Sequence, residues 1–359
     1  MSVTSNPAKH TRNEYIDACR GVAAISVVAI HTAFFGYPDV PTWFKSLTLF
    51  VDVPFFFYLS GWASSYKQPD VLRALKSVLK IWFQWLVFIL VINIFCYISL
   101  KLPYSYMPVT NIRDLAKCLL FDQNISPGFF VVGMSTWFMP YYMATILINN
   151  ALLRLVRDSK RRDMYCIAYI AVLILLVFWA YMHPGCFGYH PPFFLFYSAL
   201  WTFGYIRAEK RSSAVGFIIT LCLCAVGLYF FCYLDVIMRG IPWYDMQDSK
   251  CIPSGKYLFA SLFFIFIGGN LERFVKKANR VLSHIGKNAL YYFFGQGVGS
   301  SILAYGHISL DIRPWGLKWV VYFLINLVIT IFVAEISRYI YKGINALFDL
   351  IYKKIRRIE

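Results

Sequence analysis

Long apolar stretches separated by short polar segments repeat along the whole of the 359-residue chain. Because a transmembrane helix needs about 20 mostly apolar residues, each stretch of this length is a candidate span. The pattern predicts ten spans, near residues 17–36, 46–66, 79–100, 136–156, 164–181, 187–206, 214–234, 256–270, 289–305 and 318–340. The sixth and eighth are short or interrupted by Pro191, Pro192 and Gly255. The predicted fold is therefore all-α, a polytopic membrane bundle of about ten transmembrane helices.

The amino-acid composition supports a membrane protein and excludes a soluble one. Hydrophobic residues make up 59% of the chain and charged residues 15%, whereas globular proteins contain about 25% charged residues. The 33 Phe, 26 Tyr and 10 Trp add more apolar surface than one soluble core would bury. We expect three parts: a cytoplasmic tail over 1–14, a transmembrane domain over 15–341 and a basic cytoplasmic tail over 342–359.

The charged residues orient the predicted bundle. The chain has 35 lysines and arginines against 18 aspartates and glutamates, an excess that nucleic-acid-binding proteins also show. If the N-terminus is cytoplasmic, the inner loops and tails hold 25 of these cations and the outer loops hold 9. This asymmetry follows the positive-inside rule, so we expect an N-in, C-in protein whose partner is the lipid bilayer and not nucleic acid. The polar N-terminal tail has no apolar stretch, so we expect no cleavable signal before the first span.

The nine cysteines are scattered along the chain, and most lie in or beside apolar stretches. No spacing among them resembles a zinc site. We therefore interpret them as small packing residues and expect no bound metal.

The first predicted span carries two ionisable side chains on one face. Arg20 and His31 are 11 residues apart, which at about 100° and 1.5 Å per residue places them on one stripe of a helix, roughly 16 Å apart. Ionisable residues inside a membrane are costly, so they indicate a functional site. The alternatives are that His31 is a satisfied packing residue and that Arg20 snorkels to phosphate or pairs with Asp17.

Other polar residues also fall within predicted spans. Asp52 lies at a depth similar to that of His31 and could orient its imidazole, or it could cap a helix or pair with Lys45. Ser60, beside Gly61, is better explained by close helix packing, although its hydroxyl could contact a bound substrate. Four further side chains are expected to form interhelical hydrogen bonds: Asn93, Asn149, Asn326 and Glu335.

Two outer segments are expected to be structured. Residues 110–121 have apolar positions at helical spacing, which predicts an interfacial helix that could form a lid, or a loop resting on the headgroups. In 235–256, Trp243 and Tyr244 lie near Asp245. Aromatic and acidic side chains together suit a sugar, although an aromatic belt at the membrane surface explains the aromatic residues equally well.

Four blocks of the sequence resemble the acyltransferase family 3 membrane proteins. Residues 15–24 (YIDACRGVAA), with Arg20 and the later His31, resemble the first span of that family. Three weaker blocks follow in order, at 53–62 (VPFFFYLSGW), 136–141 (TWFMPY) and 285–291 (IGKNALY). Together they extend the resemblance over most of the chain.

The resemblance implies a ten-helix enzyme of a bacterial inner membrane, without a fused extracytoplasmic hydrolase-like domain. Such an enzyme transfers an acyl group, usually acetyl, from cytoplasmic acyl-CoA to a hydroxyl of a cell-surface or lipid-linked glycan. Acetyl-CoA is then a substrate, and no permanently bound cofactor is expected. The family's arginine and histidine correspond to Arg20 and His31. The chain departs from many members at Gln296, where they have histidine.

These expectations assign roles to individual residues. His31 would act as general base on the acceptor hydroxyl, with Asp52 beside it, and a covalent acyl-histidine stays open. The donor would be bound by cations near the inner face and one hydroxyl: Arg20, Arg73, Lys76, Lys80, Lys287 and Ser60. The acceptor would be bound on the outer side by Trp137, Trp243, Asp245 and Gln296.

Two other classes of function suit a basic polytopic protein. A secondary transporter or exporter could use Arg20 and His31 as a proton relay. A flippase or scaffold in glycan assembly would leave both residues with structural roles. No pairing between the two halves of the chain indicates the inverted repeats typical of transporters, and the basic inner loops suit a phosphorylated donor.

Overall fold

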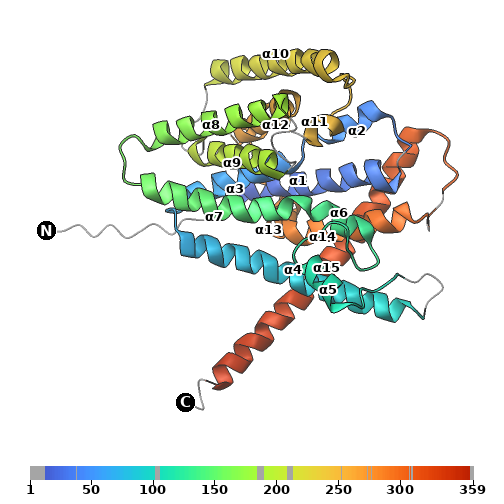
Figure 1. Cartoon of the computed structure of the whole chain (residues 1–359). Coiled ribbons are helices and arrows are strands. Elements are labelled where there is room, and N and C mark those ends of the chain that lie inside the picture. The colour runs from blue at the N-terminus through green and yellow to red at the C-terminus, as the bar shows by residue number, and fades with distance from the viewer. Residues whose placement is uncertain are drawn as a thin grey trace.

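The computed structural model describes residues 13–355, apart from 38, 102–105, 184–189, 208–212, 252, 273, 276, 307 and 309. Residues 1–12 of the predicted N-terminal tail and 356–359 of the predicted C-terminal tail lie outside the described residues. The described part of the chain folds into helices and contains no strand. Most of the helices run side by side along one direction, as Figure 1 shows, and α15 crosses them obliquely. The all-α helix bundle expected from the sequence is confirmed.

The first half of the chain forms α1 (Glu14–His31), η1 (Thr32–Gly36), α2 (Thr42–Thr48), α3 (Val53–Ser65), α4 (Val71–Ser99), α5 (Ile112–Leu119), α6 (Phe130–Ser135), η2 (Thr136–Phe138) and α7 (Met139–Val156). The second half forms α8 (Arg162–Met182), α9 (His190–Arg207), α10 (Ala214–Arg239), α11 (Gln247–Cys251), α12 (Gly255–Leu271), α13 (Arg280–Lys287), α14 (Ala289–Ala304) and α15 (Trp315–Ile355). Here η1 is a π-helical segment and η2 a 3₁₀ turn.

Seven helical segments among the described residues are long and apolar enough to cross a membrane, including α2 with α3 and α6 with α7. The other three predicted spans correspond to α9, α12 and α14, and α12 has only 17 residues. Much of α9 and most of α14 is buried against other helices, so these two helices need less hydropathy than a lipid-facing span. The count of ten and the orientation stay predictions.

Glycines let pairs of helices approach each other closely. A Cβ atom at Gly61 of α3 would lie 1.8 Å from the carbonyl oxygen of Trp201 in α9, and one at Gly286 of α13 would lie 1.6 Å from the carbonyl oxygen of Asp17 in α1. The expectation that the Ser60–Gly61 pair marks close helix packing is confirmed at Gly61. The second contact brings α13 against the first turns of α1, where Arg20 lies.

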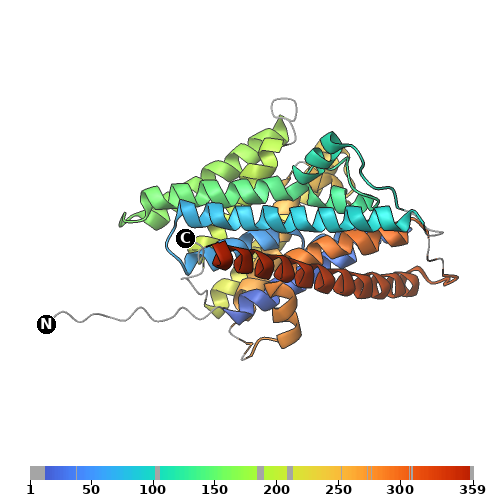
Figure 2. The ribbon, with the colours of Figure 1, turned by 90° about the horizontal axis from the view of Figure 1, so that it is seen from below.

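The two longest helices, α15 and α4, contact each other on one side of the bundle. Figure 2 shows α4 between α7 and α15, and α4 contacts both. α15 continues as a helix beyond residue 341, where the sequence predicts the start of the C-terminal tail. On the opposite side, α10 packs mainly on α12 (Figure 1) and exposes apolar side chains along its length.

The helix predicted over 110–121 is confirmed as α5, but it does not lie across the ends of the other helices. Asn93 of α4 bonds to the backbone of Val109 before α5 begins, and the Trp82 and Trp85 indoles of α4 donate to carbonyl oxygens at the end of α5, both at 3.0 Å. The segment therefore returns alongside α4 and packs against its middle turns.

Candidate active site

Two adjoining cavities open at the end of the bundle that the charge pattern assigns to the cytoplasm. One has a volume of about 450 Å³ and lies among α1, α3, α4 and α7. The other, of about 320 Å³, extends toward α13 and α14. Both are lined by Arg20, Ser77, Ile81 and Tyr142, so Arg20 stands where the cavities meet.

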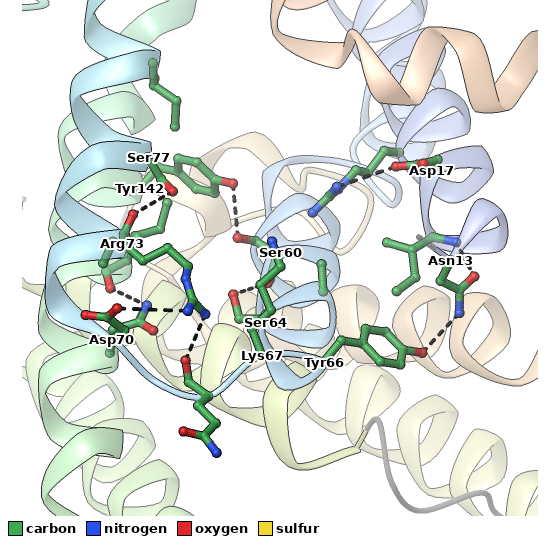
Figure 3. Close-up of a pocket in the computed structure, with 18 residues that line it drawn as sticks. Asn13, Asp17, Ser60, Ser64, Tyr66, Lys67, Asp70, Arg73, Ser77 and Tyr142 are labelled. Carbon is green, nitrogen blue, oxygen red and sulfur yellow. Dashed lines mark hydrogen bonds and ion pairs between the residues drawn. The ribbon is translucent and has the colours of Figure 1, made fainter. Parts of the chain in front are cut away.

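Polar side chains hold the wall of the larger cavity in place, as Figure 3 shows. Tyr142 donates a hydrogen bond to the Ser60 hydroxyl at 3.0 Å. Arg73 donates to the carbonyl oxygen of Gln68 at 3.3 Å and lies 4.0 Å from Asp70. Asp70 also caps α4 by accepting from the backbone N–H of Leu72, so the turn before α4 positions Arg73 at the cavity.

The structure brings together five of the six residues predicted to bind the donor. Arg20, Ser60 and Arg73 line the larger cavity, whereas Lys80 and Lys287 line the smaller one together with Arg20. Lys76 lines neither cavity. Residues from α1, α3, α4 and α13 thus surround one connected volume.

Arg20 also makes the contact proposed as its structural alternative. Its Nη1 lies 3.7 Å from Asp17 Oδ1, and its side chain keeps 24% of its surface exposed. This long ion pair and the cavity position are compatible, since a guanidinium has five N–H donors.

Sequence reasoning did not single out several cavity residues. Tyr142 and Gln84 line the cavities, and Gln84 donates to the Tyr291 hydroxyl at 2.8 Å. Tyr66 and Lys67 line the larger cavity, and Lys67 was predicted only as an inner cation. The TWFMPY block, directly followed by Tyr142, was the one available signal for that residue.

His31 lies at the last residue of α1, where the helix passes into the π-helical segment η1. Its Nδ1 lies 2.5 Å from Gln296 Oε1 of α14, and its ring meets Phe35 edge-on with ring centroids 5.5 Å apart. Gln296, predicted as an acceptor ligand, is therefore the direct partner of the imidazole.

The expected contact between Asp52 and His31 is replaced by another. Asp52 Oδ2 accepts hydrogen bonds from Lys250 Nζ at 2.5 Å and from the Tyr257 hydroxyl at 3.1 Å. Its side chain neither caps α3 nor pairs with Lys45. Asp52 and Lys250 remain close enough to interact electrostatically with His31, so we call His31, Gln296, Asp52 and Lys250 the outer polar cluster.

Lys250 was expected only as an outer-loop cation, yet α11 inserts it into this cluster. Its side chain is 11% exposed, and its Nζ lies 5.1 Å from the centroid of the Trp137 ring, a cation–π contact. Trp137, predicted to bind the acceptor, therefore lies beside the cluster. No local sequence pattern could reveal a pairing between residues as distant in sequence as Asp52 and Lys250.

The other two predicted acceptor residues lie differently. Trp243 is 68% exposed and packs on Tyr244. Asp245 caps α11, with its carboxylate accepting from the backbone N–H of Gln247 at 2.9 Å. Neither contacts the outer polar cluster, so the prediction that they act with Gln296 receives no support from their positions.

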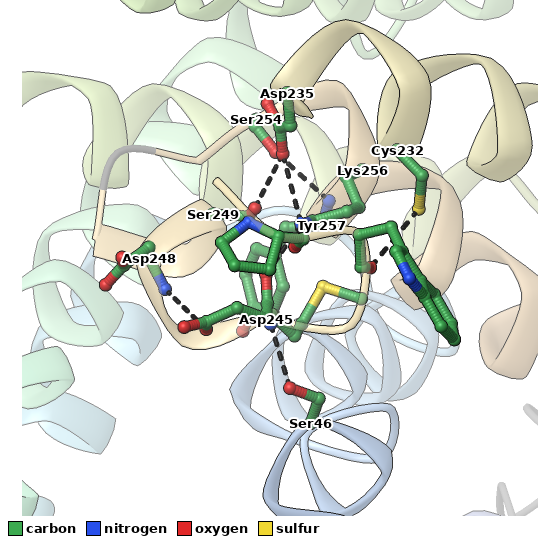
Figure 4. A network of polar contacts seen from close by, with 12 residues as sticks. Ser46, Cys232, Asp235, Asp245, Asp248, Ser249, Ser254, Lys256 and Tyr257 are labelled. Carbon is green, nitrogen blue, oxygen red and sulfur yellow. Dashed lines mark hydrogen bonds and ion pairs between the residues drawn. The ribbon is translucent and has the colours of Figure 1, made fainter. Parts of the chain in front are cut away.

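A buried network fixes the segment that carries Lys250, as Figure 4 shows. Asp235 of α10 and Lys256 of α12, both fully buried, form an ion pair at 3.3 Å. Asp235 also accepts from Ser249 at 2.7 Å and from Tyr181, and Lys256 donates to the carbonyl oxygen of Asp245 at 2.6 Å. Ser249 directly precedes Lys250, so this network positions the cation that pairs with Asp52.

Three phenylalanine rings pack together beside the smaller cavity. The rings of Phe138 and Phe293 meet edge-on at 4.9 Å and line the smaller cavity, and Phe57 lies 6.4 Å from Phe138. Phe293 is one helical turn before Gln296, and Phe138 directly follows Trp137. We call these three rings the aromatic layer; Phe138 and Phe293 bring the wall of the smaller cavity close in sequence to Trp137 and Gln296.

Comparison with known proteins bears on this arrangement. The model of the acyltransferase family 3, described as an acyltransferase domain, matches residues 13–336. Neither the curated proteins nor the solved structures gave a significant match to the chain. The matched range covers nearly the whole chain, including both cavities and the outer polar cluster. The chain therefore belongs to the acyltransferase family 3 and is an integral membrane acyltransferase.

Proposed function

We propose that the protein is an O-acyltransferase of a bacterial inner membrane. It moves an acetyl group from cytoplasmic acetyl-CoA to a hydroxyl of a cell-surface or lipid-linked glycan, with His31 as general base. The proposal rests on one observation: the basic residues around the inner cavities and the imidazole of His31 lie at different positions along the same bundle. Arg20, Arg73, Lys80 and Lys287 surround the inner cavities, and His31 lies 11 residues beyond Arg20 on the same helix.

This separation matches the donor's own layout. Acyl-CoA carries its phosphates at one end of a long flexible arm and its thioester at the other. Arginine and lysine suit the phosphates, arginine as a two-pronged donor and lysine as a point charge. The arm would then pass from Arg20 along α1 toward His31, so that the nucleotide stays in the inner cavities while the thioester reaches the base.

The chemistry needs one base at the thioester. His31 takes the proton of the acceptor hydroxyl as the hydroxyl oxygen attacks the thioester carbonyl carbon, and a new C–O bond forms. The C–S bond then breaks, and the departing thiolate receives the proton from the imidazolium as coenzyme A leaves. Asp52 and its partner Lys250 place a pair of opposite charges near the imidazole, and Trp137 offers an aromatic face to a sugar ring beside the cluster.

Labelled acetyl-CoA mixed with the purified protein and a glycan acceptor tests the proposal. We expect coenzyme A release and transfer of label to the acceptor, and His31→Ala should lower the rate by about 10²–10⁴-fold. His183→Ala is the matched control, because His183 is exposed and lines neither described cavity. A protein that moves its substrate without releasing coenzyme A would be a transporter, and full activity in His31→Ala would remove His31 as the base.

A further inference from the structure

We infer that Gln296 is a positioning residue that holds His31 in the tautomer with its hydrogen on Nδ1, leaving Nε2 free to accept a proton. The inference rests on the proposed function for its role in the reaction, while the tautomer itself follows from hydrogen bonds between α1, α14 and α15.

The hydrogen bonds around Gln296 take their direction from a backbone carbonyl oxygen, which can only accept. The Thr32 hydroxyl donates its one hydrogen to the carbonyl oxygen of Val28 at 2.7 Å, so toward other groups Thr32 Oγ1 is an acceptor. Its partner is Asn326 Nδ2 at 2.9 Å. Because the amide nitrogen faces Thr32, the amide oxygen of Asn326 points the other way, where it accepts from the Thr330 hydroxyl at 3.3 Å.

The same series of hydrogen bonds continues to Gln296. Asn326 Nδ2 donates its second hydrogen to Ser300 Oγ at 3.0 Å. The hydroxyl hydrogen of Ser300 is then directed to Gln296 Oε1 at 3.5 Å. In the structure the oxygen of the Gln296 amide faces both Ser300 and His31, and an amide turned the other way would deprive the Ser300 hydrogen of this acceptor.

This orientation fixes the imidazole. Gln296 Oε1 has no hydrogen to give, so the 2.5 Å contact to His31 Nδ1 requires the hydrogen to lie on Nδ1. In a neutral ring Nε2 then carries the lone pair, which is the form a general base needs. The donor-to-acceptor direction of this whole series of hydrogen bonds therefore starts from the carbonyl oxygen of Val28, four residues before Thr32.

Burial protects this arrangement from exchange with water. Thr32, Gln296, Ser300, Asn326 and Thr330 are all fully buried. The described residues also offer no hydrogen-bond partner to Gln296 Nε2, although buried amides that only stabilise a fold are normally satisfied at both ends. An amide whose oxygen is fully engaged beside the base and whose nitrogen is unused fits a functional position better than a packing one.

The tautomer can be measured without turnover. In protein labelled with ¹⁵N-histidine, the His31 signals are identified as those lost in His31→Ala, and their nitrogen shifts report which nitrogen carries hydrogen. We expect hydrogen on Nδ1 in the wild type. In Gln296→Ala we expect a large share of hydrogen on Nε2, the form that free imidazole side chains prefer. Hydrogen on Nε2 in the wild type, or an unchanged tautomer in Gln296→Ala, would overturn the inference.

Kinetics then tests the role in the reaction. Gln296→Ala should lower kcat about 10- to 100-fold, the range typical of removing a group that orients a histidine, with KM for acetyl-CoA changed less than about twofold. Gln296→Glu, which keeps an acceptor in place, should restore most of kcat and move the acidic limb of the pH profile to higher pH, because a carboxylate favours the imidazolium.

Asn149→Ala is the matched control. Asn149 is a buried amide that bonds α7 to α9 at Ser198 and Thr202, so its loss should affect stability and leave the His31 signals unchanged. An equal loss of kcat in Asn149→Ala and Gln296→Ala, with no rescue by Gln296→Glu, would reduce Gln296 to a structural role. A wild-type protein with the expected tautomer and no acyl transfer would instead contradict the proposed function alone.

Discussion

Replacing Arg20 by alanine should weaken binding of the donor more than it slows the chemical step. The guanidinium stands where the two inner cavities meet, keeps 24% of its side-chain surface exposed and lies 3.7 Å from Asp17. Such a long ion pair leaves donors free for a phosphate or a carbonyl of the pantetheine arm. In the proposed reaction the thioester reacts at the other end of the helix, beside His31, so kcat at saturating donor should change little.

The size of the effect follows from the bonds that Arg20 would make. A hydrogen bond to a charged group contributes about 1.5–3 kcal/mol, and each 1.4 kcal/mol is a factor of ten. We therefore expect acetyl-CoA to bind about 10- to 150-fold more weakly to Arg20→Ala. Arg20→Lys should recover part of this loss, because lysine keeps the charge and loses the planar pair of donors.

Titration calorimetry with acetyl-CoA, together with KM and kcat for each variant, measures this effect. Arg157→Ala serves as the control, since Arg157 pairs with Asp158 on the surface and lines neither described cavity. Thermal unfolding of all variants in one detergent would detect a loss of fold. Unchanged affinity for acetyl-CoA in a folded Arg20→Ala protein would show that Arg20 only anchors α1.

Three further predictions concern sidedness, packing and the outer polar cluster. In oriented proteoliposomes, acetyl-CoA supplied on the face that carries the inner cavities should acetylate an impermeant acceptor on the other face. Turnover only with both substrates on one side would contradict the proposal that the donor arm passes along α1 toward His31. Gly61→Ala should destabilise the protein by about 1–3 kcal/mol, as overpacking does. The control Gly343→Ala, whose added methyl meets no atom within 4 Å, should not lower thermal stability, because alanine is more favourable than glycine inside a helix. Lys250→Ala, which leaves the buried Asp52 without its cation, should lower the free energy of unfolding by about 3–5 kcal/mol. Adding Asp52→Asn should recover part of that loss in the same unfolding assay, and no recovery would argue against the Asp52–Lys250 pair.

The features that could be predicted from the sequence depend on residues that are close together along the chain. Hydrophobic length identified the helices, and the helical repeat placed Arg20 and His31 on one stripe because both belong to a single helix, α1. The basic residues of α4 and α13 were expected at the inner end from the charge pattern. Arg73, Lys80 and Lys287 line the cavities, whereas Lys76 and Arg280 do not.

The partners of His31 could not be predicted in the same way. Gln296 and Lys250 reach the outer polar cluster from α14 and α11, far along the chain, and which side chain meets His31 depends on how whole helices pack. Depth alone suggested Asp52 because it lies level with His31, but depth does not specify direction. The tautomer depends further on Asn326, a residue that sequence reasoning assigned only a structural hydrogen bond.

The aromatic layer also bears on the electrical insulation of the membrane. A bundle with an open cavity at one end and charged groups with a titratable ring at the other could conduct protons down a potential worth about 2.3 kcal/mol per charge per 100 mV. Mutual packing of Phe57, Phe138 and Phe293 would interrupt such a route. An acyl arm that passes between the rings would fill the gap that it opens, so the bound donor itself would block the passage of protons. On this view, catalysis across the bilayer and a tight seal against ions depend on the same three rings.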